Sequence, residues 1–229
     1  MHLFIGNKLY SSWSLRVWFL LTAFDFEFSE TVIPLDEPDT AARIMSLSAA
    51  GRVPVLKDDG VVIWESLSII EYLHDRFPER RIWPLDSAAR AHARSAASEM
   101  HASFLCLRSA CPMNLGKRFA RRDRGVGVAE DVKRIEALWD EARTTFGVGS
   151  DDPFLYGQLS AADAMFAPVV SRLDTYNIDV TSRSRMYMDA VLSHPAFVAW
   201  REAAVRETWI VASDEVPELA IADLRDGMS

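Results

Sequence analysis

Two short motifs carry groups that could hold a peptide-like ligand. The first is Val53-Pro54, which follows Arg52 and precedes an apolar segment. Proline cannot donate a hydrogen bond to a sheet, so Pro54 lies at the first residue of a strand or just before it. If the Val53-Pro54 bond is cis, the amide and carbonyl groups of Val53 turn sideways and can pair with an extended ligand as an added strand would. The alternative is a proline that only shapes a turn.

The second motif is Glu65-Ser66, which lies where an apolar run ends and a helical pattern begins. Free amides and the positive end of the helix dipole attract a carboxylate at such a corner. Ser66 is also a favourable N-cap residue. The pair therefore predicts a carboxylate-binding corner or, alternatively, an ordinary helix start.

Ser11 and Ser12 open an earlier helical pattern, in which Val17, Leu20 and Leu21 fall on one apolar face. Either hydroxyl can cap the free amides of this helix. Taken without any wider context, capping is the simpler interpretation of both serines.

The composition disfavours several classes of protein. The chain has 229 residues, of which 49% are hydrophobic, enough for a substantial core in one large or two modest domains. The net charge is −8, so we expect no nucleic-acid partner. No apolar run approaches the roughly 18 residues of a membrane span, and the first residues lack the basic region of a signal peptide. We therefore expect a cytoplasmic protein with no membrane partner.

The two cysteines, Cys106 and Cys111, do not share one face of the helix on which they are predicted to lie. No histidine pair with metal-ligand spacing lies beside them. We expect reduced, buried thiols and no metal site, and a redox role is the alternative.

The hydrophobic pattern predicts an α/β domain followed by an all-α domain. Residues 1–78 show the order β-α-β-α-β-β-α, which is typical of a small mixed sheet with helices on its faces. Residues 79–87 read as a linker, and residues 88–229 are helical in pattern. Strands are expected at 2–5, 28–33, 55–57 and 61–64, and helices at 10–24, 41–47 and 66–77.

Three helices are expected at defined places in the second domain. One long helix covers 88–108, another includes 135–146, and a last one covers 196–206, with a basic loop at 118–127.

A further helix begins at Ser160 and Asp163, which have the spacing of a capping box. This helix is apolar nearly all round, which predicts the buried centre of the domain. Pro168 should kink it.

Together these motifs resemble the cytosolic glutathione S-transferase superfamily over essentially the whole chain. Val53-Pro54 precedes the third strand, Glu65-Ser66 opens the third helix, and the Ser-x-x-Asp box starts the buried helix. The run Ser11-Ser12-Trp13-Ser14-Leu15-Arg16 most resembles the Ser-Ser-Cys-Ser-x-Arg signature of the zeta class, whose bacterial and other members include maleylacetoacetate isomerases. It departs at Trp13, which stands where that signature has cysteine.

The resemblance implies a thioredoxin-like domain that binds glutathione, a helical domain that supplies the second-substrate site, and a homodimer. Val53 would pair its backbone with the cysteinyl part of glutathione, and Pro54 would be cis. The Glu65 carboxylate would face the γ-glutamyl ammonium, and the Ser66 hydroxyl and amide would face the α-carboxylate. Arg52 would reach the glycyl carboxylate.

It also implies that Ser11 or Ser12 activates the glutathione thiol. A thiol has a pKa near roughly 8.5 and is mostly protonated at neutral pH, whereas the thiolate is the nucleophile. A hydroxyl at a helix N-terminus, helped by the dipole, stabilises the anion, and one unit of pKa corresponds to only about 1.4 kcal/mol. The sequence does not separate the two serines, and Ser11 is preferred.

The wall of the second-substrate site is predicted to include Trp13, which is bulky enough to shape a pocket. The other candidates lie on or after the long helix and are Met100, His101, Phe104, Met113 and Asn114. Packing in the core or in a dimer interface is the alternative for each of them.

The functional hypothesis is a detoxifying glutathione transferase that adds the thiolate to a small hydrophobic electrophile. Glutathione-dependent cis-trans isomerisation of the maleylacetoacetate type is a second hypothesis. A third is a binding module that keeps the fold without turnover.

Overall fold

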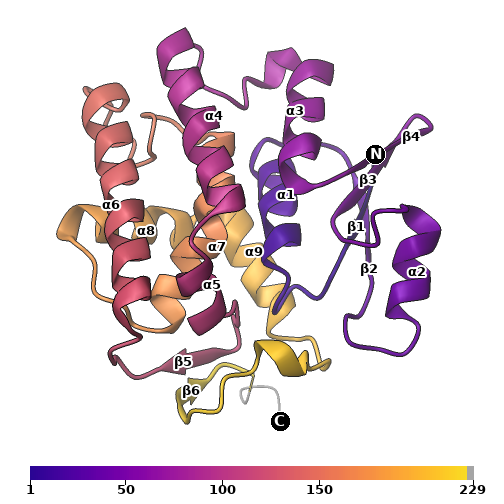
Figure 1. Ribbon diagram of the computed structural model, residues 1–229. Coiled ribbons are helices and arrows are strands. Elements are labelled where there is room, and N and C mark those ends of the chain that lie inside the picture. The colour runs from indigo at the N-terminus through magenta and orange to yellow at the C-terminus, as the bar shows by residue number, and fades with distance from the viewer. Residues whose placement is uncertain (226–229) are drawn as a thin grey trace.

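The N-terminal part of the chain forms a four-stranded sheet with the strand order β2-β1-β3-β4 (Figure 1). The computed structural model describes residues 1–225. Strand β1 is parallel to β2 and antiparallel to β3, and β3 is antiparallel to β4. The strands are β1 His2–Ile5, β2 Ser29–Val32, β3 Val55–Asp58 and β4 Val61–Trp64.

Turn chemistry and apolar periodicity explain this arrangement. Asp59 and Gly60 have positive φ angles of 45° and 82°, which a tight two-residue hairpin requires, so β4 folds back on β3. Helices α1 (Ser12–Ala23) and α3 (Ser66–Arg76) contact each other and lie on the side of the sheet that faces the helical domain. Helix α2 (Thr40–Leu47) lies on the other side (Figure 1). The predicted β-α-β-α-β-β-α order is confirmed.

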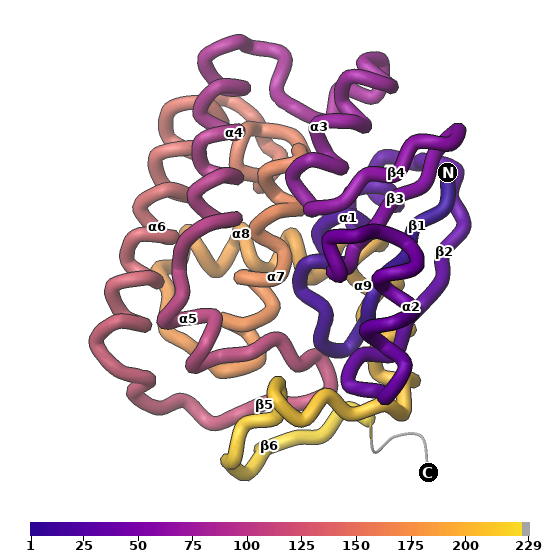
Figure 2. Tube along the Cα trace, turned by 45° about the vertical axis from the view of Figure 1, so that its right-hand side comes forward, coloured from indigo at the N-terminus to yellow at the C-terminus, as the bar shows by residue number. Residues whose placement is uncertain are grey.

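The rest of the described chain is mainly helical, as predicted. Its helices are α4 Ser87–Ala102, α5 Leu105–Ala110, α6 Val126–Phe146, α7 Ala161–Thr175, α8 Ser182–Ser193 and α9 Pro195–Ala204. Nearly every residue of α7 is buried, and this helix packs against α1, α4 and α8. It therefore forms the centre of the helical domain and joins it to the first domain (Figure 2). Pro168 lies inside α7, and the kink expected there stays a prediction.

The single long helix expected over 88–108 is wrong, because the chain turns at Ser103 and Phe104. Phe104 has a φ of 62° and its ring is buried, so the helix cannot continue through it. The Asp131 carboxylate accepts a hydrogen bond from the Leu107 amide at 2.9 Å. That bond satisfies one of the free amides at the start of α5 and so stabilises the break.

The break also changes the exposure of the thiols. Cys111 is buried as expected, and burial raises the pKa of its thiol to about 11. Cys106 is exposed, so the expectation that both thiols are buried is wrong for this residue. No three His, Cys, Asp or Glu side chains within residues 1–225 gather into a possible metal site.

Two short strands and one helix were missed by the sequence analysis. Strand β5 (Lys117–Phe119) overlaps the segment interpreted as a basic loop, and β6 (Ala220–Asp223) lies in the acidic C-terminal segment that follows residue 213. They pair antiparallel, so the C-terminal segment returns to the helical domain at the lower edge of the molecule (Figure 1). Helix α8 is the missed helix. Over the described residues, no helix combines the length and apolar character that a membrane crossing requires.

Candidate functional site

A cavity of about 580 Å³ lies where the first domain meets helices α5 and α7. Its lining includes seven of the residues predicted from sequence, namely Ser11, Ser12, Trp13, Arg52, Val53, Pro54 and Glu65. These residues come from the start of α1, the turn before β3 and the corner between β4 and α3. The fold therefore brings the three motifs of the first domain to one hollow.

The start of α1 presents two hydroxyls to this cavity. Ser11 occupies the N-cap position, but its side chain makes no capping hydrogen bond. The Ser11 and Ser14 hydroxyl oxygens lie 2.7 Å apart, and Ser14 Oγ also accepts a hydrogen bond from the Gly6 amide at 3.0 Å. Because a hydroxyl donates one hydrogen bond and accepts two, the Ser14 proton can point to Ser11 and leave the Ser11 proton for a ligand.

The turn before β3 has the geometry expected from its sequence. The Val53-Pro54 bond is cis, as predicted, and Pro54 directly precedes β3. Arg52 lies at the rim, with its Nη1 atom 3.9 Å from Oε1 of Glu65.

The corner between β4 and α3 differs in one respect from expectation. Glu65, not Ser66, is the N-cap residue of α3, and it has a φ of 68°. Ser66 is completely buried, and its hydroxyl lies 3.5 Å from Nη1 of Arg16. The Ser66 side chain is thus outside the lining of the cavity, although its amide lies at the helix start. The interpretation of Ser66 as the N-cap is wrong.

The residues predicted for the second-substrate wall are mostly not in the cavity lining. Trp13 lines it, whereas Met100, Phe104, Met113 and Asn114 are buried and lie outside the lining.

His101 contacts both Trp13 and Glu65. Its ring lies edge-on to Trp13 with 5.0 Å between the ring centres, and its Nε2 atom is 3.8 Å from Oε2 of Glu65. Burial, and then the nearby Arg16, lower the pKa of the His101 ring. The neutral form of His101 is therefore favoured at neutral pH.

Three charged residues in the lining were missed by the sequence analysis: Arg108 on α5, Arg172 on α7, and Asp214 from the C-terminal segment. The signal for Arg172 was available, because it is the one basic residue of a helix that is apolar nearly all round. Burial raises the pKa of Asp214, and Arg172 opposes this rise.

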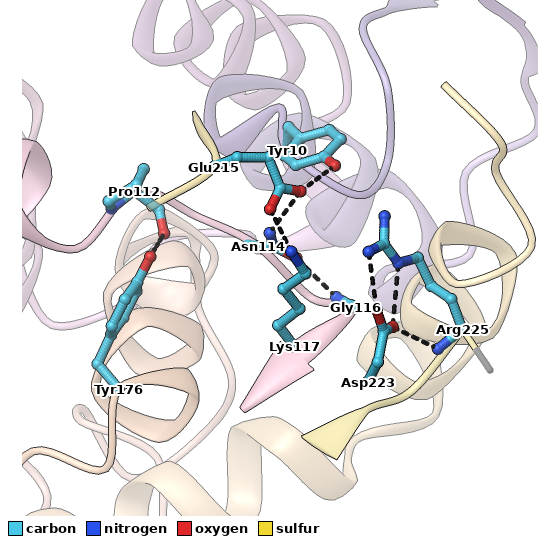
Figure 3. Close-up of polar contacts among 9 residues, drawn as sticks. All are labelled: Tyr10, Pro112, Asn114, Gly116, Lys117, Tyr176, Glu215, Asp223 and Arg225. Atoms are coloured by element: carbon cyan, nitrogen blue, oxygen red, sulfur yellow. Dashed lines mark hydrogen bonds and ion pairs between the residues drawn. The ribbon is translucent and has the colours of Figure 1, made fainter. Parts of the chain in front are cut away.

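The C-terminal segment is hydrogen-bonded to Tyr10, the residue before Ser11. Oε1 of Glu215 accepts hydrogen bonds from the Tyr10 hydroxyl at 2.6 Å and from the Asn114 amide at 3.1 Å (Figure 3). Its Oε2 atom lies 2.5 Å from the Lys117 ammonium. Burial alone would raise the pKa of Glu215, but the hydrogen bonds from Lys117 and Tyr10 bring it below its ordinary value. This cluster holds Asp214 at the edge of the cavity.

Comparison with known proteins gives two family matches and several relatives. Residues 10–76 match the glutathione S-transferase N-terminal domain, and residues 119–203 match the glutathione S-transferase C-terminal domain. A probable maleylacetoacetate isomerase from Caenorhabditis elegans is 28% identical over 82% of this chain and 86% of its own. A maleylacetoacetate isomerase from Pseudomonas aeruginosa is 26% identical over 86% of this chain and 93% of its own.

Solved structures share the fold. A glutathione transferase homologue from Burkholderia with bound glutathione has a TM-score of 0.68 at 19% identity, covering 90% of this chain and 98% of its own. A maleyl pyruvate isomerase, a bacterial glutathione S-transferase of the zeta class, has a TM-score of 0.64 at 18% identity, covering 89% and 98%.

Proposed function

Because the chain belongs to the glutathione S-transferase family, we propose that it binds glutathione in this cavity and adds the glutathione thiolate to a small electrophile. The observation that carries the proposal is the convergence of the α1 start, Val53 and Glu65 on one cavity. These three places offer a thiol-facing hydroxyl, a backbone for an extended peptide and a carboxylate for an ammonium group.

Each end of glutathione has a counterpart in this proposal. The backbone of Val53 pairs with the cysteinyl part, the Glu65 carboxylate binds the γ-glutamyl ammonium, and the Ser66 amide binds the α-carboxylate at the start of α3. Arg52 binds the glycyl carboxylate at the rim. Residues 1–78 would bind glutathione and residues 88–229 would supply the second-substrate site.

Ser11 supports the reaction by holding the sulfur as an anion. In the structure the Ser11 hydroxyl donates to Ser14 Oγ at 2.7 Å. On binding, the Ser11 hydroxyl turns to donate to the sulfur, and the Ser14 hydroxyl can then donate to Ser11 and keep it oriented. A hydrogen bond to a charged group contributes about 1.5–3 kcal/mol, which lowers the thiol pKa by roughly one to two units. The thiol proton goes to solvent, a sulfur lone pair forms the new C–S bond, and the leaving group departs with the electron pair of the bond that breaks.

A second candidate is cis-trans isomerisation, which the similarity to maleylacetoacetate isomerases favours. The same thiolate would add reversibly to the double bond of the substrate. Rotation and loss of the thiolate then return glutathione unchanged. A transferase consumes glutathione and an isomerase does not, so the two candidates differ in stoichiometry.

The test has three measurements on one preparation. Isothermal titration measures glutathione binding, conjugation of 1-chloro-2,4-dinitrobenzene and related electrophiles measures transfer, and conversion of maleylacetoacetate measures isomerisation. We expect binding, with consumption of glutathione by at least one electrophile. Binding without conjugation but with isomerisation would move the assignment to the second candidate. Binding with neither reaction identifies a binding module, and absence of binding overturns both enzymatic proposals.

We further propose that the active protein is a cytoplasmic homodimer. Light scattering of the purified chain should give twice the monomer mass of 25.7 kDa.

A further inference from the structure

The residues that lead into α1 are held by a part of the chain that lies beyond the family-matched ranges. The match to the C-terminal domain ends at residue 203, and helix α9 ends at Ala204. Residues 205–215 follow, and they are hydrogen-bonded to the loop between β1 and α1, which covers residues 6–11 and ends at Ser11. The family matches therefore do not imply these contacts.

Glu207 binds the backbone of this loop at two consecutive residues. Its Oε1 atom accepts a hydrogen bond from the Lys8 amide at 2.8 Å, and its Oε2 atom accepts one from the Leu9 amide at 3.1 Å. Hydrogen bonds to an ionised acceptor are about twice as strong as neutral ones. Because two bonds to one planar group fix direction as well as position, Glu207 sets the course of the backbone just before Tyr10 and Ser11.

The carbonyl groups of the same two residues are also bonded to distant parts of the chain. Nε1 of Trp200, on α9, donates to the Lys8 carbonyl oxygen at 2.9 Å. The Leu115 amide donates to the Leu9 carbonyl oxygen at 3.2 Å. Connecting segments are ordinarily more mobile than the elements they join, but here the amide and the carbonyl of both residues have partners outside the loop. The approach to Ser11 is therefore fixed from the second domain.

Glu215 holds the side chain of Tyr10, the residue directly before Ser11. Oε1 of Glu215 accepts hydrogen bonds from the Tyr10 hydroxyl at 2.6 Å and from the Asn114 side-chain amide at 3.1 Å, and its Oε2 atom lies 2.5 Å from the Lys117 ammonium (Figure 3). Burial and the hydrogen bond to Glu215 raise the pKa of Tyr10, which keeps its hydroxyl protonated. Because that proton is used within the protein, Ser11 and not Tyr10 is left to donate to a ligand.

We propose that Glu207 and Glu215 are positioning residues, which hold Ser11 where its hydroxyl can donate to the sulfur of glutathione. This inference rests on the proposed function, because it concerns the hydroxyl that activates the thiol. Neither carboxylate is among the described residues that line the cavity, so each acts on the sulfur only through Ser11. Position matters because a displacement of about 1 Å can cost on the order of 100-fold in rate.

The variant Glu215→Ala tests the contact with Tyr10. It should raise the pKa of the bound glutathione thiol by about 0.5–1 unit and lower kcat by roughly tenfold, while the KM for glutathione changes by less than about twofold. The thiol pKa is measured from the ultraviolet absorption of the bound thiolate as a function of pH. Charge alone would act in the opposite direction, because loss of a nearby negative group favours the thiolate. Glu215→Gln keeps an oxygen acceptor for Tyr10 and should restore most of the activity.

A double variant shows whether the effect passes through Ser11. In a Ser11→Ala background, the further change Glu215→Ala should alter kcat by less than about twofold, since the hydroxyl that it positions is already absent. Tyr10→Phe removes one hydroxyl and should reproduce Glu215→Ala. A tenfold loss from Glu215→Ala in the Ser11→Ala background would overturn the proposal. A larger loss in Tyr10→Phe than in Ser11→Ala would assign the sulfur contact to Tyr10 and would also overturn it.

A matched control separates positioning from stability. Glu218 pairs with Arg122 and Arg124 at 3.2 Å and 2.7 Å rather than with the loop before α1. Glu218→Gln should lower the melting temperature at least as much as Glu215→Ala does, yet change kcat by less than about twofold and leave the thiol pKa unchanged. Glu207→Gln loses one of two acceptor oxygens and should lower kcat by about threefold. Equal losses of kcat in Glu215→Ala and Glu218→Gln would show that Glu215 only stabilises the fold.

The absorption measurement keeps this test apart from turnover. If the wild type lowers the thiol pKa and Glu215→Ala leaves that pKa unchanged, the positioning role is overturned while the proposed function stands. Glutathione bound by the wild type without a lowered thiol pKa would also overturn the positioning role. If a thiolate is bound but no electrophile is conjugated, a rise in its pKa in Glu215→Ala supports the positioning role and removes the transferase proposal. Absence of bound glutathione overturns both.

Discussion

Helices α1 and α7 pack against each other, and serine is the N-cap residue of both. The two helix starts differ in how many of their polar groups are hydrogen-bonded within the protein. At α7, the amide and hydroxyl of Ser160 donate to Asp163 at 2.8 Å and 2.9 Å. The Leu155 amide donates to the same carboxylate at 3.2 Å. At α1, the Ser11 hydroxyl does not cap the helix and lines a cavity.

The difference shows how one residue type serves two purposes. The α7 start is sealed, because Asp163 is completely buried and accepts hydrogen bonds from the groups around it. It confirms the predicted capping box. The α1 start is open, because Ser11 and Ser12 face space large enough for a ligand. A helix start with all its polar groups paired within the protein stabilises the fold, and one with hydroxyls facing a cavity can bind something else.

The largest effect is expected when the Asp163 carboxylate is removed from the start of α7. Asp163→Ala removes the acceptor of three donors, so it should lower the free energy of unfolding by about 3 kcal/mol. Chemical denaturation at pH 7 measures this loss. Asp163→Asn keeps one acceptor oxygen and should lose less. A change below about 0.5 kcal/mol for Asp163→Ala would show that the box contributes little.

The dependence of stability on pH provides a second test of the role of Asp163. Burial raises the pKa of Asp163 to about 6 in the folded protein, above its ordinary value of 3.8. The folded state therefore holds this proton more tightly than the unfolded state. The part of the stability that comes from this pKa shift is fully present below about pH 4 and is lost as the pH rises through about 6. The hydrogen bonds that the carboxylate accepts remain at pH 7. Asp163→Ala should lack this loss.

An intermediate effect is expected when the Ser11 hydroxyl is removed from the start of α1. Ser11→Ala should lower kcat for conjugation by roughly 30-fold, since one hydrogen bond to a thiolate is lost. Its free energy of unfolding should change by less than about 1 kcal/mol, because Ser11 makes no capping bond. Ser12→Ala is the matched control and should change kcat by less than about threefold. If instead Ser12→Ala abolishes activity and Ser11→Ala does not, the roles of the two serines are reversed.

The smallest effect is expected from a change at Glu65, the N-cap residue of α3, which lines the cavity. Glu65 is about one-third exposed, and the nearest side-chain nitrogens of Arg52 and His101 lie 3.9 Å and 3.8 Å from its carboxylate oxygens. Glu65→Gln should raise the KM for glutathione by about fivefold and leave kcat nearly unchanged. Glu71→Gln, farther along the same helix, provides the comparison. A fall in kcat larger than the rise in KM would contradict a role limited to binding.

Local signals were sufficient to predict the first domain. The Asp59-Gly60 turn, Pro54 before a strand and the apolar face of α1 each depend on neighbouring residues, and the resulting element order is confirmed. They also placed the three motifs that the fold brings to the cavity. The family assignment followed from the same motifs and is confirmed by the family matches.

The break between α4 and α5 depends on distant residues, so the sequence pattern did not reveal it. Phe104 turns inward to reach the core, and Asp131, from α6, caps the new helix. The second-substrate wall was misjudged for the same reason. An apolar residue such as Met100 is buried by packing, whereas Arg108 faces the cavity because α5 starts in a new direction.

Because the Tyr10 hydroxyl donates a hydrogen bond to Glu215, the cavity can be completed only after the C-terminal segment has been synthesised. The two residues are separated by 205 positions. At about 5–20 residues per second, a ribosome makes Glu215 roughly 10–40 s after Tyr10. The segment beside the serines is thus translated first and anchored last. A nascent chain released before Asp214 and Glu215 would contain every motif of the first domain without the contacts that complete its cavity.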